Sequence, residues 1–183
     1  MAETAADLGF DGIDLTVREG GHVQPERVAE DLPKAVEVVR EAGLDVPMIT
    51  AGIVDTSSPH AETIIRTAGE LDIDRYRWGW FSWSDSAKTP DLSNFHQSIE
   101  RSPALVINVP ERIAQLKERV KALAELNRKY GVCAMYHHHS GSMVGASVWD
   151  LWLLIKDLDP RWASKPGETP ESNAPKPSSG DRC

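Results

Sequence analysis

The feature that most constrains the fold of this chain is a regular alternation of short apolar runs with longer amphipathic segments. Four of the apolar runs are expected to form strands, namely residues 10–17, 46–52, 75–83 and 132–136. Five segments with helical spacing of apolar residues are expected to form helices, namely residues 2–8, 25–42, 60–71, 110–130 and 147–158. Because repeated strand–helix units favour parallel strands joined by right-handed crossovers, the sequence predicts an α/β protein.

The ends of two predicted helices carry characteristic residues. Pro25 and Pro110 stand in first turns, where a missing N–H costs no hydrogen bond. Gly43 and Gly131 follow the last apolar positions, where a left-handed residue commonly ends a helix. These positions therefore support the predicted boundaries.

The third predicted strand alternates aromatic and basic side chains. Tyr76, Trp78 and Trp80 fall on one parity, and Arg75 and Arg77 fall on the other. We therefore expect one face of this strand to be less fully covered. Trp78 is expected in the core, whereas Trp80 lies nearer the carboxyl end of the strand and is a candidate ligand contact.

Composition limits the classes of partner. The chain has 183 residues, 40% of them hydrophobic, which suffices for one domain with a sizeable core. Its net charge of −8, with Lys and Arg scattered, argues against nucleic acid or an anionic membrane as partner. No apolar run approaches the roughly 20 residues that span a bilayer, and the first residues lack the basic start of a signal peptide. Cys133 and Cys183 are the only cysteines, so a disulfide framework is not expected. We therefore expect a cytoplasmic location.

The composition changes after residue 162. Residues 163–183 are rich in Pro and Ser and contain no aromatic residue and no aliphatic residue larger than alanine. Such a segment cannot bury enough apolar surface to offset the entropy of ordering. We therefore expect one domain over residues 1–162, followed by a disordered tail over residues 163–183.

Three consecutive histidines follow the fourth predicted strand. Alternation places His137 and His139 on one face and His138 on the other. The end of a strand before a helix is where α/β sheets and barrels place their chemistry, and imidazole serves as a metal ligand or an acid–base group. The alternative interpretation is a set of polar residues that ends a strand.

Three segments of the chain share a resemblance to a known family. They are Leu-Gly-Phe-Asp-Gly-Ile-Asp-Leu at residues 8–15, Leu-Asn-Arg-Lys-Tyr-Gly-Val at residues 126–132, and His-His-Ser-Gly at residues 138–141 with the segment 144–152 that follows it. In this order and spacing, the chain resembles the sugar phosphate isomerase/epimerase family, the xylose isomerase-like TIM barrels. A closed (β/α)8 barrel has eight strands and about 250 residues. We therefore expect a partial (β/α)8 TIM barrel of about four parallel strands and five helices, and a truncated or frameshifted chain.

The resemblance also implies a function. Relatives transfer a proton on the carbon beside a sugar carbonyl, with a divalent metal (Mn, Mg, Co or Zn) that polarises the carbonyl. It implies His137 and His139 as metal ligands, although His137 stands where metal-dependent relatives carry a glutamate, and a neutral imidazole matches a hard cation less well. The candidate contacts to a sugar or sugar phosphate are Arg18, His22, Trp80 and His139. No catalytic residue is assigned, and we expect an impaired or inactive isomerase or epimerase.

Several alternatives remain at this point. Arg18 and His22 are equally compatible with a solvated Gly-rich loop, which lacks the glycine pattern of a dinucleotide site. The second candidate function is a non-catalytic binding or scaffold half-barrel that self-associates into a homo-oligomer through its open strand edges. An open flavodoxin-like sheet is disfavoured, since Glu19 stands where a phosphate loop would be needed. Trp149 and Trp152 are expected to pack the last helix on the sheet.

Overall fold

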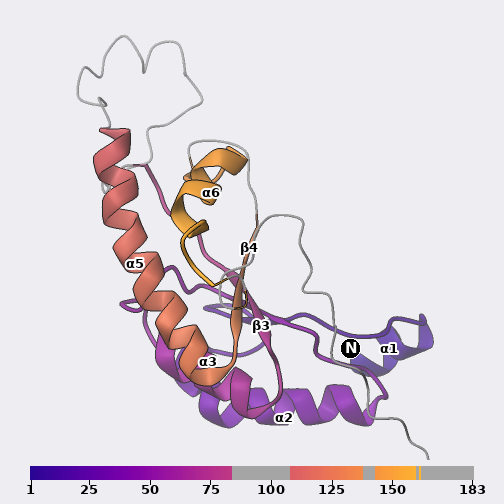
Figure 1. Ribbon diagram of the computed structural model, residues 1–183. Coiled ribbons are helices and arrows are strands. Elements are labelled where there is room, and N and C mark those ends of the chain that lie inside the picture. The colour runs from indigo at the N-terminus through magenta and orange to yellow at the C-terminus, as the bar shows by residue number, and fades with distance from the viewer. Residues whose placement is uncertain (84–107, 138–142, 160, 162–183) are drawn as a thin grey trace, which may run out of the picture.

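The computed structural model describes residues 1–83, 108–137, 143–159 and 161. Four parallel strands form one sheet in the order β1-β2-β3-β4 (Figure 1). The strands are β1 (Leu15–Val17), β2 (Ile49–Ala51), β3 (Arg75–Trp78) and β4 (Cys133–Tyr136). The helices are α1 (Ala2–Asp7), η1 (Pro25–Arg27), α2 (Val28–Glu41), α3 (Ala61–Glu70), α5 (Val109–Tyr130) and α6 (Val148–Ile155).

The helices that join the strands lie side by side along the sheet. Helix α2 contacts α3, α3 contacts α5, and α5 contacts α6. Strands that follow one another in chain order, with neighbouring helices in the same sequence, are the arrangement of consecutive units in a (β/α)8 barrel. A doubly wound sheet would instead reverse its strand order at one point. The predicted alternation is confirmed, and the flavodoxin-like alternative does not fit.

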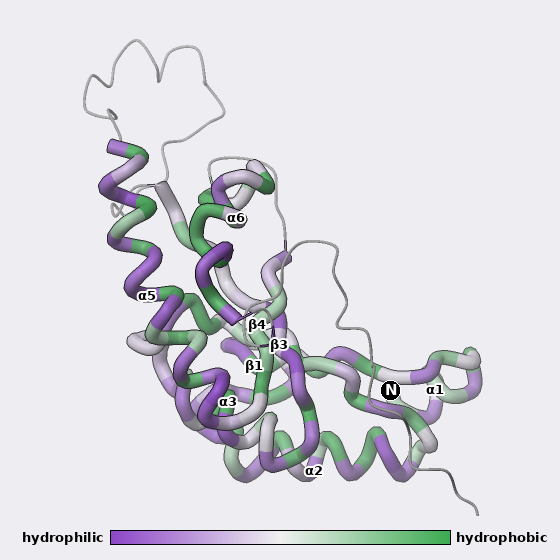
Figure 2. The backbone as a smooth tube through the Cα atoms, viewed as in Figure 1, coloured by the Kyte–Doolittle hydropathy of each residue, from purple (hydrophilic) through white to green (hydrophobic). Residues whose placement is uncertain are grey.

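One face of the sheet packs against the helix layer. Tyr76 and Trp78 of β3 are 0% and 2% exposed, and the Tyr76 hydroxyl donates a hydrogen bond of 3.1 Å to Oδ1 of Asn127 on α5. The helix residues buried against this face include Val28, Leu32, Val36, Ile64, Ile65, Leu116, Val120 and Leu123. Each such side chain contributes about 1.5–3 kcal/mol on burial. Hydrophobic and hydrophilic residues alternate along α2 and α5 with the helical turns (Figure 2).

The first strand is shorter than the sequence predicted. Phe10 is 60% exposed, and its N–H donates to the Ala5 carbonyl, so it belongs to the end of α1 and not to the strand ladder. Gly12 still makes an isolated parallel bridge with Asp45 before β1 begins at Leu15. The third strand likewise ends at Trp78, within the predicted range 75–83. Alternating hydrophobicity therefore located these strands but extended beyond their hydrogen-bonded parts.

The ends of helix α5 are fixed by two residues. The Asn108 side chain accepts a hydrogen bond from the Glu111 N–H, which satisfies one of the unpaired donors of the first turn. Gly131 adopts φ 69° at the other end, a left-handed conformation that glycine enters without steric cost. Gly43, with φ 78°, follows α2 in the same way. The predicted helix ends are confirmed.

Helix α6 corrects one expectation. Trp149 and Trp152 are 70% and 46% exposed and do not pack on the sheet, whereas Leu151, Leu154 and Ile155 are buried. Two sets of large apolar side chains spaced by three and four residues occupy opposite sides of this helix, and only one side can face the core. Among the described residues, no helix is long and apolar enough to cross a membrane. The predicted tail, residues 163–183, lies outside the described residues.

Candidate functional site

The four strands are parallel, so their carboxyl ends lie along one edge of the sheet. We call this edge, with the loops that follow Val17, Ala51, Trp78 and Tyr136, the carboxyl edge. In barrels built from parallel strands, this is the edge at which ligands bind. The predicted site residues that the structure describes, Arg18, His22, Trp80 and His137, follow β1, β3 or β4 at this edge.

The face of the sheet opposite the helix layer carries three polar side chains and one methionine in a single row. Thr16, Thr50, Arg77 and Met135 occupy one row across the four strands, since the register pairs Thr16 with Thr50, Thr50 with Arg77, and Arg77 with Met135. Alternation points this row away from the face that Tyr76 buries against α5. We call these four residues the open-face row.

A carboxylate is anchored beside the open-face row. The Thr50 hydroxyl donates a hydrogen bond of 2.6 Å to Oδ2 of Asp14. Thr50 is only 6% exposed, so this bond satisfies a buried hydroxyl and holds the Asp14 carboxylate over the open face. Sequence reasoning did not select Asp14 or Thr50 as site residues. The signal that could have found Asp14 is its shared parity with Thr16 on a strand whose other parity is apolar.

Two of the predicted site residues lie together at the carboxyl edge. The Trp80 indole Nε1 donates a hydrogen bond of 3.3 Å to the backbone carbonyl oxygen of His137. This bond joins the segment after β3 to the segment after β4, and it leaves the indole 37% exposed and His137 exposed. The predicted ligand His139 falls outside the described residues.

His22 has a structural partner in its own loop. Its Nδ1 accepts a hydrogen bond of 3.0 Å from the Thr16 N–H, which leaves the proton of a neutral ring on Nε2. Gly21 approaches the same strand so closely that a Cβ would lie 2.6 Å from the Thr16 carbonyl oxygen. Arg18 is exposed at the end of this strand. Since β1 and β4 are the first and last strands of the sheet, two strands separate the strand before this loop from the strand that precedes His137.

A pocket of about 440 Å³ opens between the loops that follow β1 and β2. Its polar lining consists of Arg18, Glu19, Gln24, Glu26 and His60. Its remaining walls come from the end of β1, from η1, from the residues after β2 and from the start of α3. Of these side chains, only Arg18 was selected from the sequence. The others could have been found from their place, because each one follows a strand or precedes a helix at the carboxyl edge.

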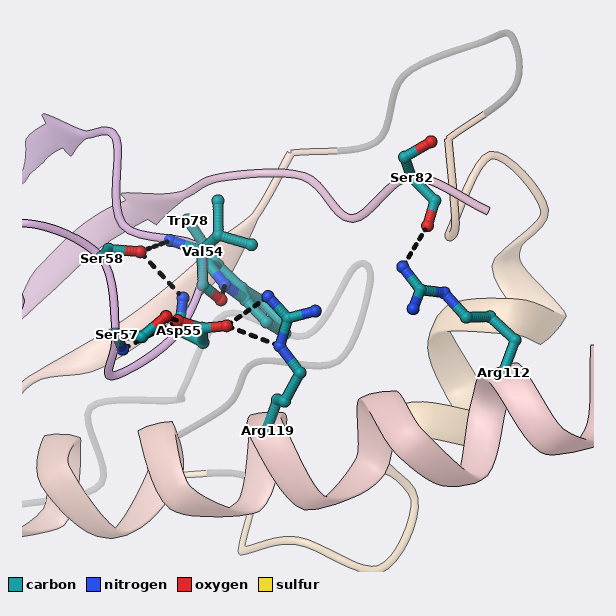
Figure 3. A network of polar contacts seen from close by, with 8 residues as sticks. All are labelled: Val54, Asp55, Ser57, Ser58, Trp78, Ser82, Arg112 and Arg119. Carbon is teal, nitrogen blue, oxygen red and sulfur yellow. Dashed lines mark hydrogen bonds and ion pairs between the residues drawn. The ribbon is translucent and has the colours of Figure 1, made fainter. Parts of the chain in front are cut away.

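The loop after β2 is held against α5 by an ion pair (Figure 3). Asp55 is 4% exposed, and its Oδ1 accepts hydrogen bonds from the N–H and the hydroxyl of Ser57 at 2.8 and 2.6 Å. Its Oδ2 accepts a hydrogen bond of 2.6 Å from Nε of Arg119, and Nη2 of Arg119 also contacts it. Burial alone would raise the pKa of Asp55, but the bonds from Ser57 and Arg119 outweigh burial and lower that pKa. Asp55 therefore supports the loop as a fixed anion.

Two further bonds fix the neighbouring segments. Nε1 of Trp78 donates to the Val54 carbonyl at 2.7 Å, and Nη2 of Arg112 on α5 donates to the Ser82 carbonyl at 2.9 Å (Figure 3). Helix α5 therefore holds the loops after β2 and β3 through Arg119 and Arg112.

The turn before α6 is positioned by Tyr136. Its hydroxyl donates to the Val144 carbonyl, and its ring packs edge-on against Trp78 with centroids 5.4 Å apart. The left-handed Gly145 lies under this ring, where a Cβ would be 2.7 Å from Cε1 of Tyr136. Burial, with a smaller effect from Asp150, raises the pKa of Tyr136 to about 12. Tyr136 is therefore a neutral packing residue at physiological pH.

The metal site that the sequence resemblance implies has no complete ligand set among the described residues. Among the described residues, no three His, Cys, Asp or Glu side chains gather closely enough to hold a metal ion. His137 is exposed at the edge and His139 lies outside the described residues, so the two expected ligands are not tested. The described residues alone therefore supply no complete ligand set, and no chemical step is assigned to a cation.

The strand order and the helix layer define the class of protein: four consecutive βα units of a (β/α)8 TIM barrel. Two solved structures share this fold. They are 3-keto-D-glucoside 4-epimerase from E. coli in its apo form, with a TM-score of 0.55 and 10% sequence identity, and a D-tagatose 3-epimerase-like protein, with a TM-score of 0.53 and 16% identity.

The two alignments cover most of this chain and part of each neighbour. They cover 85% and 86% of this chain, but only 57% of the 3-keto-D-glucoside 4-epimerase and 55% of the D-tagatose 3-epimerase-like protein. The chain thus spans a little over half the length of these structures. At such low identities, the likeness shows the fold alone. No protein-family model matches the chain, and no curated protein matches it.

Proposed function

We propose that this chain binds a small sugar at its carboxyl edge and is of the sugar isomerase/epimerase type. The observation that carries the proposal is the open-face row, with its three polar side chains and with Asp14 beside it, on the face opposite the helix layer in a fold that solved sugar epimerases share. The reaction implied by the sequence resemblance is proton transfer on the carbon beside the sugar carbonyl.

The proposed contacts come from opposite ends of the sheet. Trp80 offers a partly exposed indole beside His137, which suits packing against the C–H face of a sugar ring, with hydrogen bonds from the neighbouring polar groups. Arg18 stands at the start of the loop after β1, and His22 in the same loop offers its Nε2–H as a donor. His139 and a divalent cation complete the set that the resemblance implies.

The proposal is tested by binding and by hydrogen exchange. Saturation-transfer NMR measures binding of D-tagatose and D-fructose, and proton NMR in D2O measures exchange of the hydrogen beside the carbonyl, with and without added Mn²⁺. Trp80→Ala is expected to weaken binding about tenfold, whereas the matched control Trp152→Ala, on the exposed side of α6, leaves binding unchanged. A wild-type chain that binds neither sugar contradicts the proposal.

A second candidate function is a non-catalytic half-barrel that self-associates. The observation that favours it is the exposed apolar side of α6, formed by Val148, Trp149, Trp152 and Leu153, together with the position of β1 and β4 at the two ends of the sheet. Light scattering after size-exclusion chromatography would then show a discrete dimer. Conversion to monomer by the double variant Trp149→Ser/Trp152→Ser, with sugar binding absent throughout, would favour this function over the first.

A further inference from the structure

Arg77 lies at the centre of the open face of the sheet. It belongs to β3, where it pairs in register with Thr50 on β2 and with Met135 on β4. Its neighbours in the strand, Tyr76 and Trp78, are 0% and 2% exposed and face the helix layer. The Arg77 side chain therefore projects from the opposite face, and it is partly buried there.

The guanidinium of Arg77 has no partner within the part of the chain that the structure describes. Three other arginines near the sheet differ in this respect. Arg75, on the same strand, pairs with Asp74 at 3.3 Å, Arg112 donates to the Ser82 carbonyl, and Arg119 pairs with Asp55. Arg77 thus stands apart as a partly buried cation without an anion among the described residues.

A partly buried guanidinium without an acceptor lowers the stability of the folded state unless a ligand supplies the acceptor. A guanidinium carries five N–H donors, and removing it from water without a partner disfavours the folded state. Met135 on one side is apolar, and the Thr50 hydroxyl on the other side donates its proton to Asp14. An anionic ligand group would supply the missing acceptors, because carboxylates and phosphates match the planar fork of arginine in bidentate geometry.

We propose that Arg77 binds an anionic group, a carboxylate or a phosphate, of the sugar ligand. This inference rests on the proposed function and adds the chemical class of its substrate: an acidic or phosphorylated sugar. Asp14 fixes the orientation of that ligand, because its carboxylate is held on the β1 side of Thr50 and repels a second anion. The anionic group lies toward β4 and His137, and the uncharged hydroxyls lie toward Thr16 and Asp14.

Three matched sugars test this inference. D-fructose, D-fructose 6-phosphate and D-fructuronate differ only at carbon 6, which is an alcohol, a phosphate ester and a carboxylate respectively. Titration calorimetry of the full chain is expected to show that at least one anionic sugar binds about tenfold to a hundredfold more tightly than D-fructose. The stronger of the two identifies the anion. Inorganic phosphate and acetate serve as probes of the anion without the sugar.

Two variants of the same strand separate binding from folding. Arg77→Gln is expected to remove the preference for the anionic sugar over D-fructose, and Arg77→Lys is expected to retain part of the preference. The control Arg75→Gln alters an arginine of the same strand and parity that already has Asp74 as partner, so it leaves the preference intact. Circular dichroism confirms that each variant is folded.

The outcomes distinguish the two proposals. If the wild-type chain binds D-fructose but shows no preference for either anionic sugar, or if Arg77→Gln keeps the preference, the role of Arg77 is refuted and the proposed function stands. If the chain binds none of the three sugars, both proposals are refuted together.

Discussion

Replacement of Asp55 by asparagine is expected to destabilise the chain by about 2–3 kcal/mol. The carboxylate is 4% exposed and accepts two bonds from Ser57 and further contacts from Arg119. Asparagine keeps an acceptor for Ser57, but its NH2 group would face the guanidinium as donor against donor. The loss stays below that of a fully buried pair because the Arg119 side chain is 41% exposed and regains water.

This contribution depends on pH in a defined direction. The pKa of Asp55 lies below its ordinary value of 3.8 in the folded chain, so the folded state favours the ionised carboxyl. The stabilisation is therefore fully present above about pH 5 and is lost as the pH falls through the folded-state pKa. The difference in unfolding free energy between wild type and Asp55→Asn should shrink over the same acidic range.

Urea and thermal denaturation, each followed by circular dichroism, measure the unfolding free energy and the thermal midpoint. At pH 7, Asp55→Asn is expected to lower the midpoint of thermal unfolding by roughly 4–12 °C. The control Arg128→Gln breaks the exposed pair with Glu125 on the same helix, where both side chains are about 60% exposed, and should cost less than about 0.5 kcal/mol. If Asp55→Asn changes stability as little as the control does, the reasoning from burial and charge pairing is wrong.

Three further substitutions test the packing and the loop. Tyr76→Phe removes the buried hydrogen bond to Asn127 and should cost about 1 kcal/mol in urea denaturation, with no change in fold by circular dichroism. Gly131→Ala places a Cβ on a residue with φ 69° and should cost about 1–2 kcal/mol, whereas no loss would mean that the end of α5 relaxes. His22→Ala removes the acceptor for the Thr16 N–H and should increase amide hydrogen exchange at Thr16, which NMR measures, with no more than about 1 kcal/mol of destabilisation.

Local patterns sufficed for much of the fold. The alternation of apolar runs and amphipathic segments predicted the four strands and the helices between them, and Gly43 and Gly131 end their helices in left-handed backbone as predicted. The same patterns failed where two signals overlap. Phe10 fits the alternation of the first strand, but its N–H donates a hydrogen bond to the Ala5 carbonyl oxygen at the end of α1. On α6, spacing alone did not tell which of two apolar sides is buried.

The candidate site could be predicted from the sequence only in part. Strand ends pointed to Trp80 and His137, and these do lie together, but their contact runs through a backbone carbonyl oxygen that no residue pattern reveals. The unequal parities of β3 indicated a less covered face without assigning a role to Arg77. The pocket beside Arg18 was missed, because its polar lining comes from two loops that are separate in the sequence.

The sequence by itself determined the order of strands and helices and the face on which each strand residue stands, because both depend on spacing along the chain. Tertiary structure alone decided which of these residues meet. Thr50 and Arg77 become neighbours only through strand register, and Asp55 pairs with Arg119 across 64 positions of sequence. The physical reason is that register and packing are chosen by the burial of the whole helix-covered face, so the polar neighbours on the open face follow from contacts that no single segment encodes.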